Sequence, residues 1–191
     1  MANAISSTPS PAGKAEYHIR TATLTDLSPL VDVLVSSFYP PNRFNRWLYP
    51  VMRVGINEDL KLRLRAHSPR YYCLAAIAPN EQLVGTAEVA LRSPLPLLPQ
   101  RAYVSNLAVS DGHRRRGVAR QLLQSCEVLA QSWGKQTLYL HVAKDNIAAQ
   151  QLYDQLQYHP APSQLESFAN QFGLPYSKQL RVKHILHSSR G

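Results

Sequence analysis

Residues 103–120 read YVSNLAVSDGHRRRGVAR, and this stretch indicates how the chain folds. Its first seven residues predict a strand, and residues 110–116 form a polar loop after it. Gly117 then opens a predicted helix that runs to Trp133, with apolar side chains at helical spacing on one face. Because a helix N-terminus leaves backbone N–H groups without partners, a strand, loop and helix in this order form a ready anion site.

Four arginines lie beside this loop. Arg114, Arg115 and Arg116 directly precede the helix, and Arg120 follows one turn later. A pyrophosphate suits a cluster of guanidinium groups next to free amides. The alternative is a solvated basic run or a nucleic-acid patch, but the position directly before a helix favours the phosphate loop.

The rest of the chain predicts alternating strands and helices around this unit. A hairpin is expected because a Pro-Asn-Glu turn separates two apolar runs, and the long middle helix is expected to be interrupted near Pro50 and Gly55. The expected strands are 17–23, 71–78, 82–91, 103–109, 137–143 and 176–186, and the expected helices are 25–39, 46–67, 117–133 and 148–156. One α/β domain is expected over residues 16–188, after a flexible tail over residues 1–15.

The composition is that of a globular protein. Of 191 residues, 45% are hydrophobic and 17% are charged, and the longest apolar runs fall far below the roughly 20 residues that cross a bilayer, so no membrane span is expected. Two cysteines are too few for a disulfide scaffold, which favours a cytoplasmic location. The Ser/Pro-rich, nearly acid-free start leaves a plastid leader, and hence the plastid stroma, as an alternative.

The segment 114–119, RRRGVA, resembles the Q/R-x-x-G-x-G/A signature of the Gcn5-related N-acetyltransferase (GNAT) family. Further along, Asn146-Ile147-Ala148-Ala149 and Leu152-Tyr153 stand at the distance that is usual in this family. The resemblance is strongest over Ala102–Pro160 and extends with lower specificity over 17–92. It implies an α/β fold with a single mixed central sheet and about four flanking helices, and an acetyl-CoA-dependent N-acetyltransferase.

The resemblance also implies which residues hold acetyl-CoA. Main-chain groups of one strand would bond the pantetheine arm, amides of the loop and helix would hold the pyrophosphate, and the next helix would add further contacts. In that order the residues are Leu107, Ala108 and Val109; Arg115, Arg116, Gly117, Val118, Ala119 and Arg120; and Asn146, Ile147, Ala148 and Tyr153. Asn146 has a second interpretation as a helix N-cap, and the two roles are compatible. No metal is expected, since His184 and His187 have no further ligand arranged near them.

Tyr153 matches the tyrosine that protonates the departing thiolate in this family. A phenol is a neutral proton donor at pH 7, so the role is chemically sensible. The alternative for Tyr153 is a core aromatic at helical spacing from Leu152 and Leu156.

The general base is expected to be His141 with Tyr103. Many bacterial relatives that acetylate a ribosomal protein carry a glutamate near residues 100–102, where this chain has Gln-Arg-Ala. The pattern here is similar to eukaryotic N-terminal acetyltransferases, in which a tyrosine and a histidine deprotonate the amine through water, and to plastid-type enzymes of dual α- and ε-amine specificity. An imidazole titrates near neutrality, as a base for this reaction requires. The alternative for His141 is a satisfied strand histidine.

The expected reaction is direct attack of a protein or peptide amine on acetyl-CoA in a ternary complex. The acceptor is an N-terminal α-amine, with lysine ε-amines as a second class. One alternative is a small-molecule amine, which the net charge of +9 would repel. Another is a non-catalytic relative that contacts the ribosome or RNA through basic stretches such as 43–70 and 178–190. By analogy of fold, an aromatic group is expected to grip the acceptor: Phe38, Tyr39, Phe44 and Trp47.

Overall fold

The computed structural model describes residues 17–39, 49–93, 99–161 and 178–185. In chain order the helices and strands are β1 His18–Thr21, α1 Leu27–Phe38, α2 Tyr49–Arg65, β2 Tyr71–Ile77, β3 Leu83–Arg92, β4 Arg101–Val109, α3 Val118–Ser132, β5 Thr137–Ala143, α4 Ile147–Gln155, β6 His159–Pro160 and β7 Lys178–His184. Two single 3-10 turns, Leu24–Asp26 and Asp111–His113, precede α1 and α3. The tail expected over 1–15 and the aromatic residues Phe44 and Trp47 lie outside the described residues.

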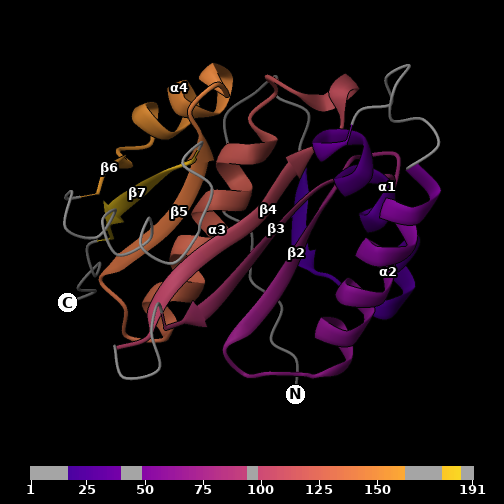
Figure 1. Ribbon diagram of the computed structural model, residues 1–191, viewed down its shortest axis with the longest axis horizontal. Helices are drawn as coiled ribbons and strands as arrows, with labels where there is room; N and C mark the ends of the chain where they lie inside the picture. The colour runs from indigo at the N-terminus through magenta and orange to yellow at the C-terminus, as the bar shows by residue number, and fades with distance from the viewer. Residues whose placement is uncertain (1–16, 40–48, 94–98, 162–177, 186–191) are drawn as a thin grey trace.

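The strands form one seven-stranded sheet in the order β1-β2-β3-β4-β5-β7-β6 (Figure 1). The β4–β5 pair is parallel and every other neighbouring pair is antiparallel. The chain passes from β4 to β5 through α3, as a parallel connection requires a crossover. The expected α/β class, with one mixed sheet and four helices in the described part of the chain, is confirmed.

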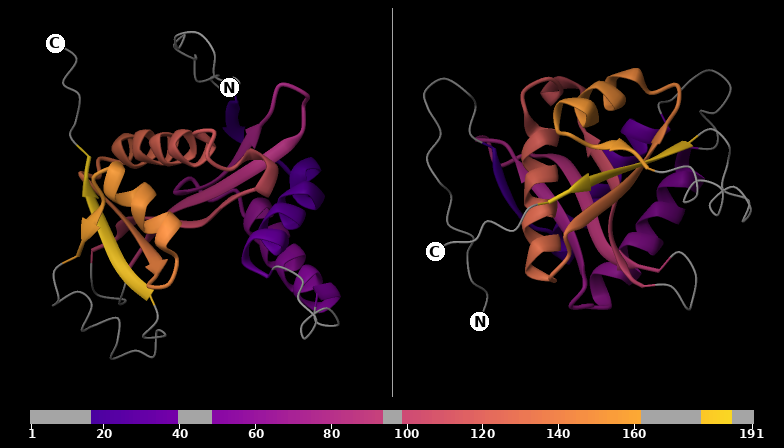
Figure 2. Two further views of the ribbon diagram at one scale, coloured as in Figure 1. Left: turned by 90° about the horizontal axis from the view of Figure 1, so that it is seen from above. Right: turned by 90° about the vertical axis from the view of Figure 1, so that its left-hand side faces the viewer.

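Helices cover the sheet on both faces. Helices α1 and α2 lie on one face and α3 lies on the other (Figure 2). One core cluster joins α1 and α2 to the odd-numbered residues of β2, and the second joins α3 and the buried side chains of α4 to the opposite face. The half of the sheet formed by β5 and β7 has no described helix on the α1–α2 face.

Simple periodicity explains these two faces. Along β5, Leu138, Leu140 and Val142 are buried on the α3 face, so Tyr139 and His141 point to the α1–α2 face. Along α3, apolar side chains recur every four residues and meet the sheet: Val118, Leu122, Cys126 and Ala130.

The structure corrects the sequence prediction at three places. Helix α2 is continuous from Tyr49, because Pro50 falls in the first turn, where a missing N–H breaks no helical bond, and Gly55 does not interrupt it. Strand β4 begins at Arg101, two residues before the expected start. Strand β6 was not expected, since two residues are too few to show a pattern.

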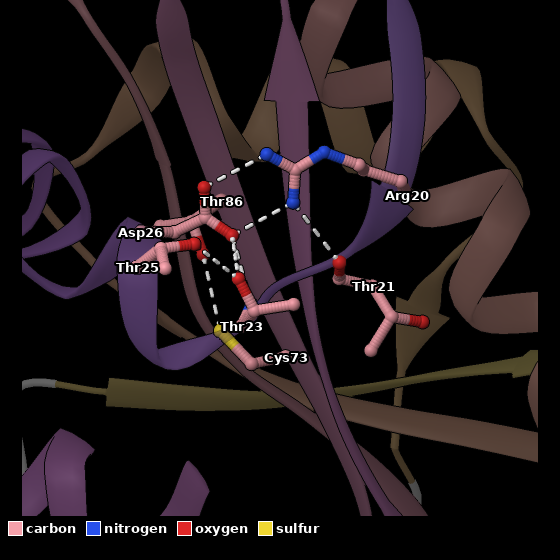
Figure 3. A network of polar contacts seen from close by, with 7 residues as sticks. All are labelled: Arg20, Thr21, Thr23, Thr25, Asp26, Cys73 and Thr86. Atoms are coloured by element: carbon pink, nitrogen blue, oxygen red, sulfur yellow. Dashed lines mark hydrogen bonds and ion pairs between the residues drawn. The ribbon is translucent and has the colours of Figure 1, made fainter.

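A polar network joins β1 to the start of α1 (Figure 3). Two nitrogens of Arg20 donate to the two carboxylate oxygens of Asp26 at 2.7 and 2.8 Å. The Thr23 N–H and hydroxyl donate to the same carboxylate at 2.8 and 3.0 Å. The Asp26 carboxylate therefore holds the turn that starts α1.

No helix in the described ranges has the length and apolar character that crossing a membrane requires.

Candidate active site

Strands β4 and β5 separate after only three paired positions. Their register is Ala102–Leu138, Tyr103–Tyr139 and Val104–Leu140, and Figure 1 shows the far ends of the two strands apart. On its other side β4 stays paired with β3 as far as Val109. The main chain of Leu107, Ala108 and Val109 therefore lies where the sheet opens.

A β-bulge lies at the point of separation. The register between β3 and β4 shifts between Thr86 and Glu88, so that Ala87 faces both Asn106 and Leu107. Asn106 has a φ of 52°, in the left-handed region, and its Nδ2 donates to Glu88 Oε1 at 2.8 Å. A bulge bends and twists its strand, so the bulge directs β4 away from β5.

Glu88 is almost fully buried, with an exposed fraction of 1%, and two neighbours compensate its charge. Arg63 of α2 forms an ion pair with its second carboxylate oxygen, in addition to the hydrogen bond from Asn106. A buried carboxylate without such partners would be very costly. The Glu88 side chain thereby ties α2 to the bulge.

Sequence reasoning missed Arg63, Glu88 and Asn106. One signal was available, because Glu88 is the only charged residue in the apolar stretch 83–91. Its two partners are 25 and 18 residues away in the chain, and no local pattern links them to it.

The loop before α3 has the backbone conformation of an anion site. Arg115 and Gly117 have positive φ values of 62° and 86°, and the Gln121 N–H makes the first helical hydrogen bond, to Gly117 O at 3.1 Å. The N–H groups of Val118, Ala119 and Arg120 precede that bond. Amides at this position of a helix are oriented to bind an anion.

The three loop arginines differ in their contacts. Arg114 donates from Nε to Val109 O at 3.0 Å and forms an ion pair of 2.8 Å with Asp111. Arg115 and Arg116 are exposed, and neither forms an ion pair with a carboxylate of the described residues. Arg114 thus fixes the loop, while the other two guanidinium groups are available to an anion.

Helix α4 begins close to this opening. Asn146 is its N-cap and accepts from the Ala149 N–H at 3.0 Å, which confirms the predicted capping role. The neighbouring residues Ile147 and Ala148 are exposed. The far end of α4 meets the first turn of α3, where Arg120 Nη2 donates to Gln155 Oε1 at 3.4 Å.

Tyr153 of α4 is both a core aromatic and a suitable proton donor. Its side chain is 7% exposed and its ring lies edge-on to that of Tyr158, with centroids 5.9 Å apart. Burial raises the pKa of Tyr153 to about 12, with the Tyr103 phenol adding to the rise and the Arg181 charge opposing it. The two interpretations of Tyr153 are therefore compatible, because a buried phenol keeps its proton at neutral pH.

Tyr103 and His141 meet on the α1–α2 face of the sheet. The Tyr103 hydroxyl and Nδ1 of His141 share a hydrogen bond of 2.7 Å, and both side chains are half-buried. Burial raises the pKa of Tyr103, while the positive charge of Arg92 opposes the rise. Whichever group holds the shared proton, the pair can take up one further proton and become an imidazolium hydrogen-bonded to a phenol.

Within the described residues, no three His, Cys, Asp or Glu side chains gather as a metal site requires. His184 ends β7, and His187 lies outside those residues.

Residues 34–158 match a family model described as the acetyltransferase (GNAT) family. A relative from Arabidopsis thaliana, GCN5-related N-acetyltransferase 10, chloroplastic, is 30% identical over 129 residues, which are 60% of this chain and 50% of the relative. GCN5-related N-acetyltransferase 4, chloroplastic, from the same plant is 44% identical over 52 residues, 27% of this chain and 18% of the relative. The chain thus spans about half the length of the first relative and less of the second.

Solved structures share the fold at low sequence identity. PaiA N-acetyltransferase from Thermoplasma acidophilum, solved in complex with coenzyme A, has a TM-score of 0.67 at 16% identity, over 88% of this chain and 99% of its own. The ribosomal-protein-S18-alanine N-acetyltransferase from Escherichia coli has a TM-score of 0.61 at 17% identity, over 92% and 98% of the two chains.

Proposed function

The chain belongs to the acetyltransferase (GNAT) family, and from this premise we propose that it transfers the acetyl group of acetyl-CoA to a protein or peptide amine. The main acceptor is an N-terminal α-amine, and lysine ε-amines form a second class. The observation that carries the proposal is the Tyr103–His141 hydrogen bond of 2.7 Å, beside the point where β4 and β5 separate. It provides a proton acceptor where an attacking amine would need one.

The residues around the opening fit acetyl-CoA. Amides at the start of α3, with Arg115 and Arg116, suit its pyrophosphate. The unpaired edge of β4 over 107–109 suits the amide groups of its pantetheine arm, and 146–148 form an exposed helix start nearby. The structural neighbour from Thermoplasma acidophilum in complex with coenzyme A supports this assignment. Acetyl-CoA supplies the acetyl group as a thioester.

Three side chains then carry out the two proton transfers of the reaction, one from the acceptor nitrogen and one to the leaving sulfur. An ammonium cannot attack, so Tyr103 and His141 accept a proton, through a water molecule, from the acceptor nitrogen. A carbon–nitrogen bond forms as the carbon–sulfur bond breaks, and the Tyr153 hydroxyl gives its proton to the leaving sulfur. The second proton that the nitrogen loses as it becomes an amide passes to water, from which Tyr153 regains its proton. The phenol of Tyr153 suits this step because its pKa of about 12 keeps it protonated.

The relatives guide the proposed acceptor and compartment. One structural neighbour is named for the alanine of a ribosomal protein, which supports a protein α-amine. The curated relatives are named chloroplastic, and both cysteines of this chain are free thiols. We therefore place the protein in a reducing compartment, the cytoplasm or the plastid stroma, which imaging of the tagged full chain would distinguish.

The test is an acetylation assay with the full chain, acetyl-CoA and proteome-derived peptides that carry free N-termini and internal lysines. Mass spectrometry then locates each added acetyl group. We expect acetylation of α-amines, and a fall in kcat of about 100-fold in Tyr153→Phe with unchanged coenzyme A affinity.

Tyr72→Phe is the matched control. Tyr72 stacks on Trp133, with ring centroids 6.0 Å apart, and the substitution again removes one phenol oxygen. Activity equal to wild type in Tyr153→Phe would refute the acid role. No acetylation of any peptide would refute the protein acceptor.

A further inference from the structure

Resting on the proposed function, we propose that the acceptor of this enzyme is an N-terminus with acidic side chains in its second to fourth positions. The feature that selects it is a positively charged aromatic surface next to the Tyr103–His141 pair. We call this surface, formed by Arg92, Arg101, Tyr103 and Tyr139, the Arg–Tyr platform.

The register of the sheet places these four residues together. Arg92 of β3 pairs with Arg101 of β4, and Tyr103 pairs with Tyr139 of β5. Alternation along the strands puts all four side chains on the α1–α2 face, the face that also carries His141. The platform therefore adjoins the atoms that are proposed to receive the proton.

Each arginine lies over a tyrosine ring. The Arg92 guanidinium is 5.1 Å from the ring centroid of Tyr103, and that of Arg101 is 5.2 Å from the ring centroid of Tyr139. Arg92 also donates from Nη2 to Ser105 Oγ at 3.3 Å. A guanidinium over an aromatic face keeps its in-plane N–H groups directed outward, in the fork that matches a carboxylate.

The platform has an excess of positive charge. Neither Arg92 nor Arg101 forms an ion pair with a carboxylate of the described residues. Glu88 is the only acidic residue among the described strand residues of this face of β3, β4 and β5, and Arg63 already neutralises it. Among the described strand residues of this face, an incoming carboxylate would therefore meet two guanidinium groups and no unpaired negative charge.

The spacing of the platform fits an extended peptide. A strand rises about 3.3 Å per residue, so Arg101 lies about 7 Å along β4 from Tyr103 and about 13 Å from the level of His141. An extended peptide also advances about 3.3 Å per residue. If its terminal amine lies at Tyr103 and His141, the side chains at its second to fourth positions therefore lie beside Arg92 and Arg101.

The same charge disfavours other acceptors. Lysines within basic sequences and polyamines would be repelled by Arg92 and Arg101. A nucleic acid is the competing polyanion. The position of the platform directly beside the proposed base favours the acceptor peptide, because RNA needs no such base.

The test compares three peptides that differ only at positions two to four. One carries Glu-Glu-Glu, one Gln-Gln-Gln and one Arg-Arg-Arg, each after the same N-terminal residue and with no amine other than the N-terminal one. With the full chain and acetyl-CoA at 50 mM NaCl, we expect kcat/KM for the acidic peptide to exceed that for the Gln peptide about tenfold. The Arg peptide should be the poorest substrate, and 500 mM NaCl should reduce the differences.

Variants locate the effect. Arg92→Gln and Arg101→Gln should each reduce the Glu-to-Gln ratio about threefold, mainly through KM. Arg92→Lys should retain only part of the ratio, since it keeps the charge and loses the guanidinium fork. Lys135→Gln is the control, because it removes one positive charge from the turn that follows α3, the helix on the opposite face of the sheet. A variant that disturbs the Tyr103–His141 pair would also lower kcat/KM for the Gln peptide, so this value shows whether catalysis itself is impaired.

Equal rates on the Glu and Gln peptides would overturn this inference and leave the proposed function intact. No transfer to any of the three peptides would overturn both. Tighter binding of an RNA oligonucleotide than of the acidic peptide, with the same loss in Arg92→Gln and Arg101→Gln, would assign the platform to nucleic acid instead.

Discussion

At the residue scale, Glu88 shows how one buried charge can organise a site. Its carboxylate accepts from Asn106 at the bulge and pairs with Arg63 of α2. The bulge lies where β4 leaves β5, so the position of the unpaired strand edge depends on this carboxylate. We therefore regard Glu88 as a positioning residue, which acts through the backbone of β4.

Substitution of Glu88 tests this role. Glu88→Ala should lower the free energy of unfolding by about 3 kcal/mol, because it leaves buried polar groups without partners. Glu88→Gln should lower it less, since the amide oxygen still accepts from Asn106. Both should raise KM for acetyl-CoA, the Ala variant more. Denaturant unfolding and steady-state kinetics measure these effects.

Glu58→Ala is the control for Glu88. Glu58 lies on α2, forms an exposed pair with Lys61 at 3.4 Å, and its side chain is 59% exposed. We expect a change below about 0.5 kcal/mol. An unchanged KM for acetyl-CoA in Glu88→Ala would show that the carboxylate does not position β4.

The pKa of Tyr153 predicts the alkaline behaviour of the enzyme. Its pKa is raised to about 12, so the phenol keeps its proton as the pH rises through 10. We expect no fall in kcat between pH 8 and pH 10. A pH profile of kcat measures this, and an alkaline fall near pH 9 that is absent in Tyr153→Phe would contradict the proposed acid.

At the element scale, close packing sets where α3 begins. A Cβ on Gly85 of β3 would lie 3.1 Å from both Ala108 O and Val118 Cγ1. Few real Cβ atoms approach other atoms so closely, so a side chain at this position would force Ala108 or Val118 to move by a few tenths of an ångström. Glycine thus lets the first residue of α3 pack closely on β3. The helix N-terminus is thereby fixed beside the end of β4.

The link between β1 and α1 predicts a pH-dependent stability. Hydrogen bonding to Arg20 lowers the pKa of Asp26 from 3.8 to about 2, with burial opposing and Thr23 adding to the fall. The folded state therefore binds this proton more weakly than the unfolded chain. The stabilisation is complete above about pH 5 and is lost as the pH falls through the folded-state pKa of about 2.

Asp26→Asn should lower the free energy of unfolding by about 1–2 kcal/mol at pH 7. The loss stays below the full value of the pKa shift, because the Arg20 side chain is 39% exposed and water screens part of the attraction. Denaturant unfolding at pH 7, 4 and 2.5 measures the difference, which should shrink at the lowest pH. Asp32→Asn is the control, since its pair with Arg53 is exposed on both sides and should contribute little.

At the scale of the whole molecule, the net charge of +9 favours anionic ligands. Coenzyme A carries several phosphates, so its binding should weaken with salt. We expect its Kd to rise about fivefold between 50 and 500 mM NaCl, measured by calorimetry.

Removing the positive charges of the loop before α3 should make the Kd for coenzyme A less dependent on salt. The double variant Arg115→Gln with Arg116→Gln should bind coenzyme A more weakly at low salt and respond less to added salt. Arg53→Gln removes a positive charge from α2 and should keep the wild-type slope. A Kd that does not change with salt would argue against a phosphate site at the loop.

The sequence alone predicted the order of the helices and of every strand except β6, and it named most residues of the candidate site. A two-residue period decided that Tyr139 and His141 share a face of β5, and a four-residue period decided the buried face of α3. The loop at 114–119 and Tyr153 could be recognised because their chemistry lies in contiguous or evenly spaced residues.

Only the tertiary structure decided how these parts meet. The separation of β4 from β5 depends on a bulge, the bulge depends on Glu88, and Glu88 depends on Arg63 of a different element. The Arg–Tyr platform likewise needs the register of three strands. Such contacts join residues far apart in the chain, and local periodicity holds no information about them, because they arise only when the strands pair and the helices pack.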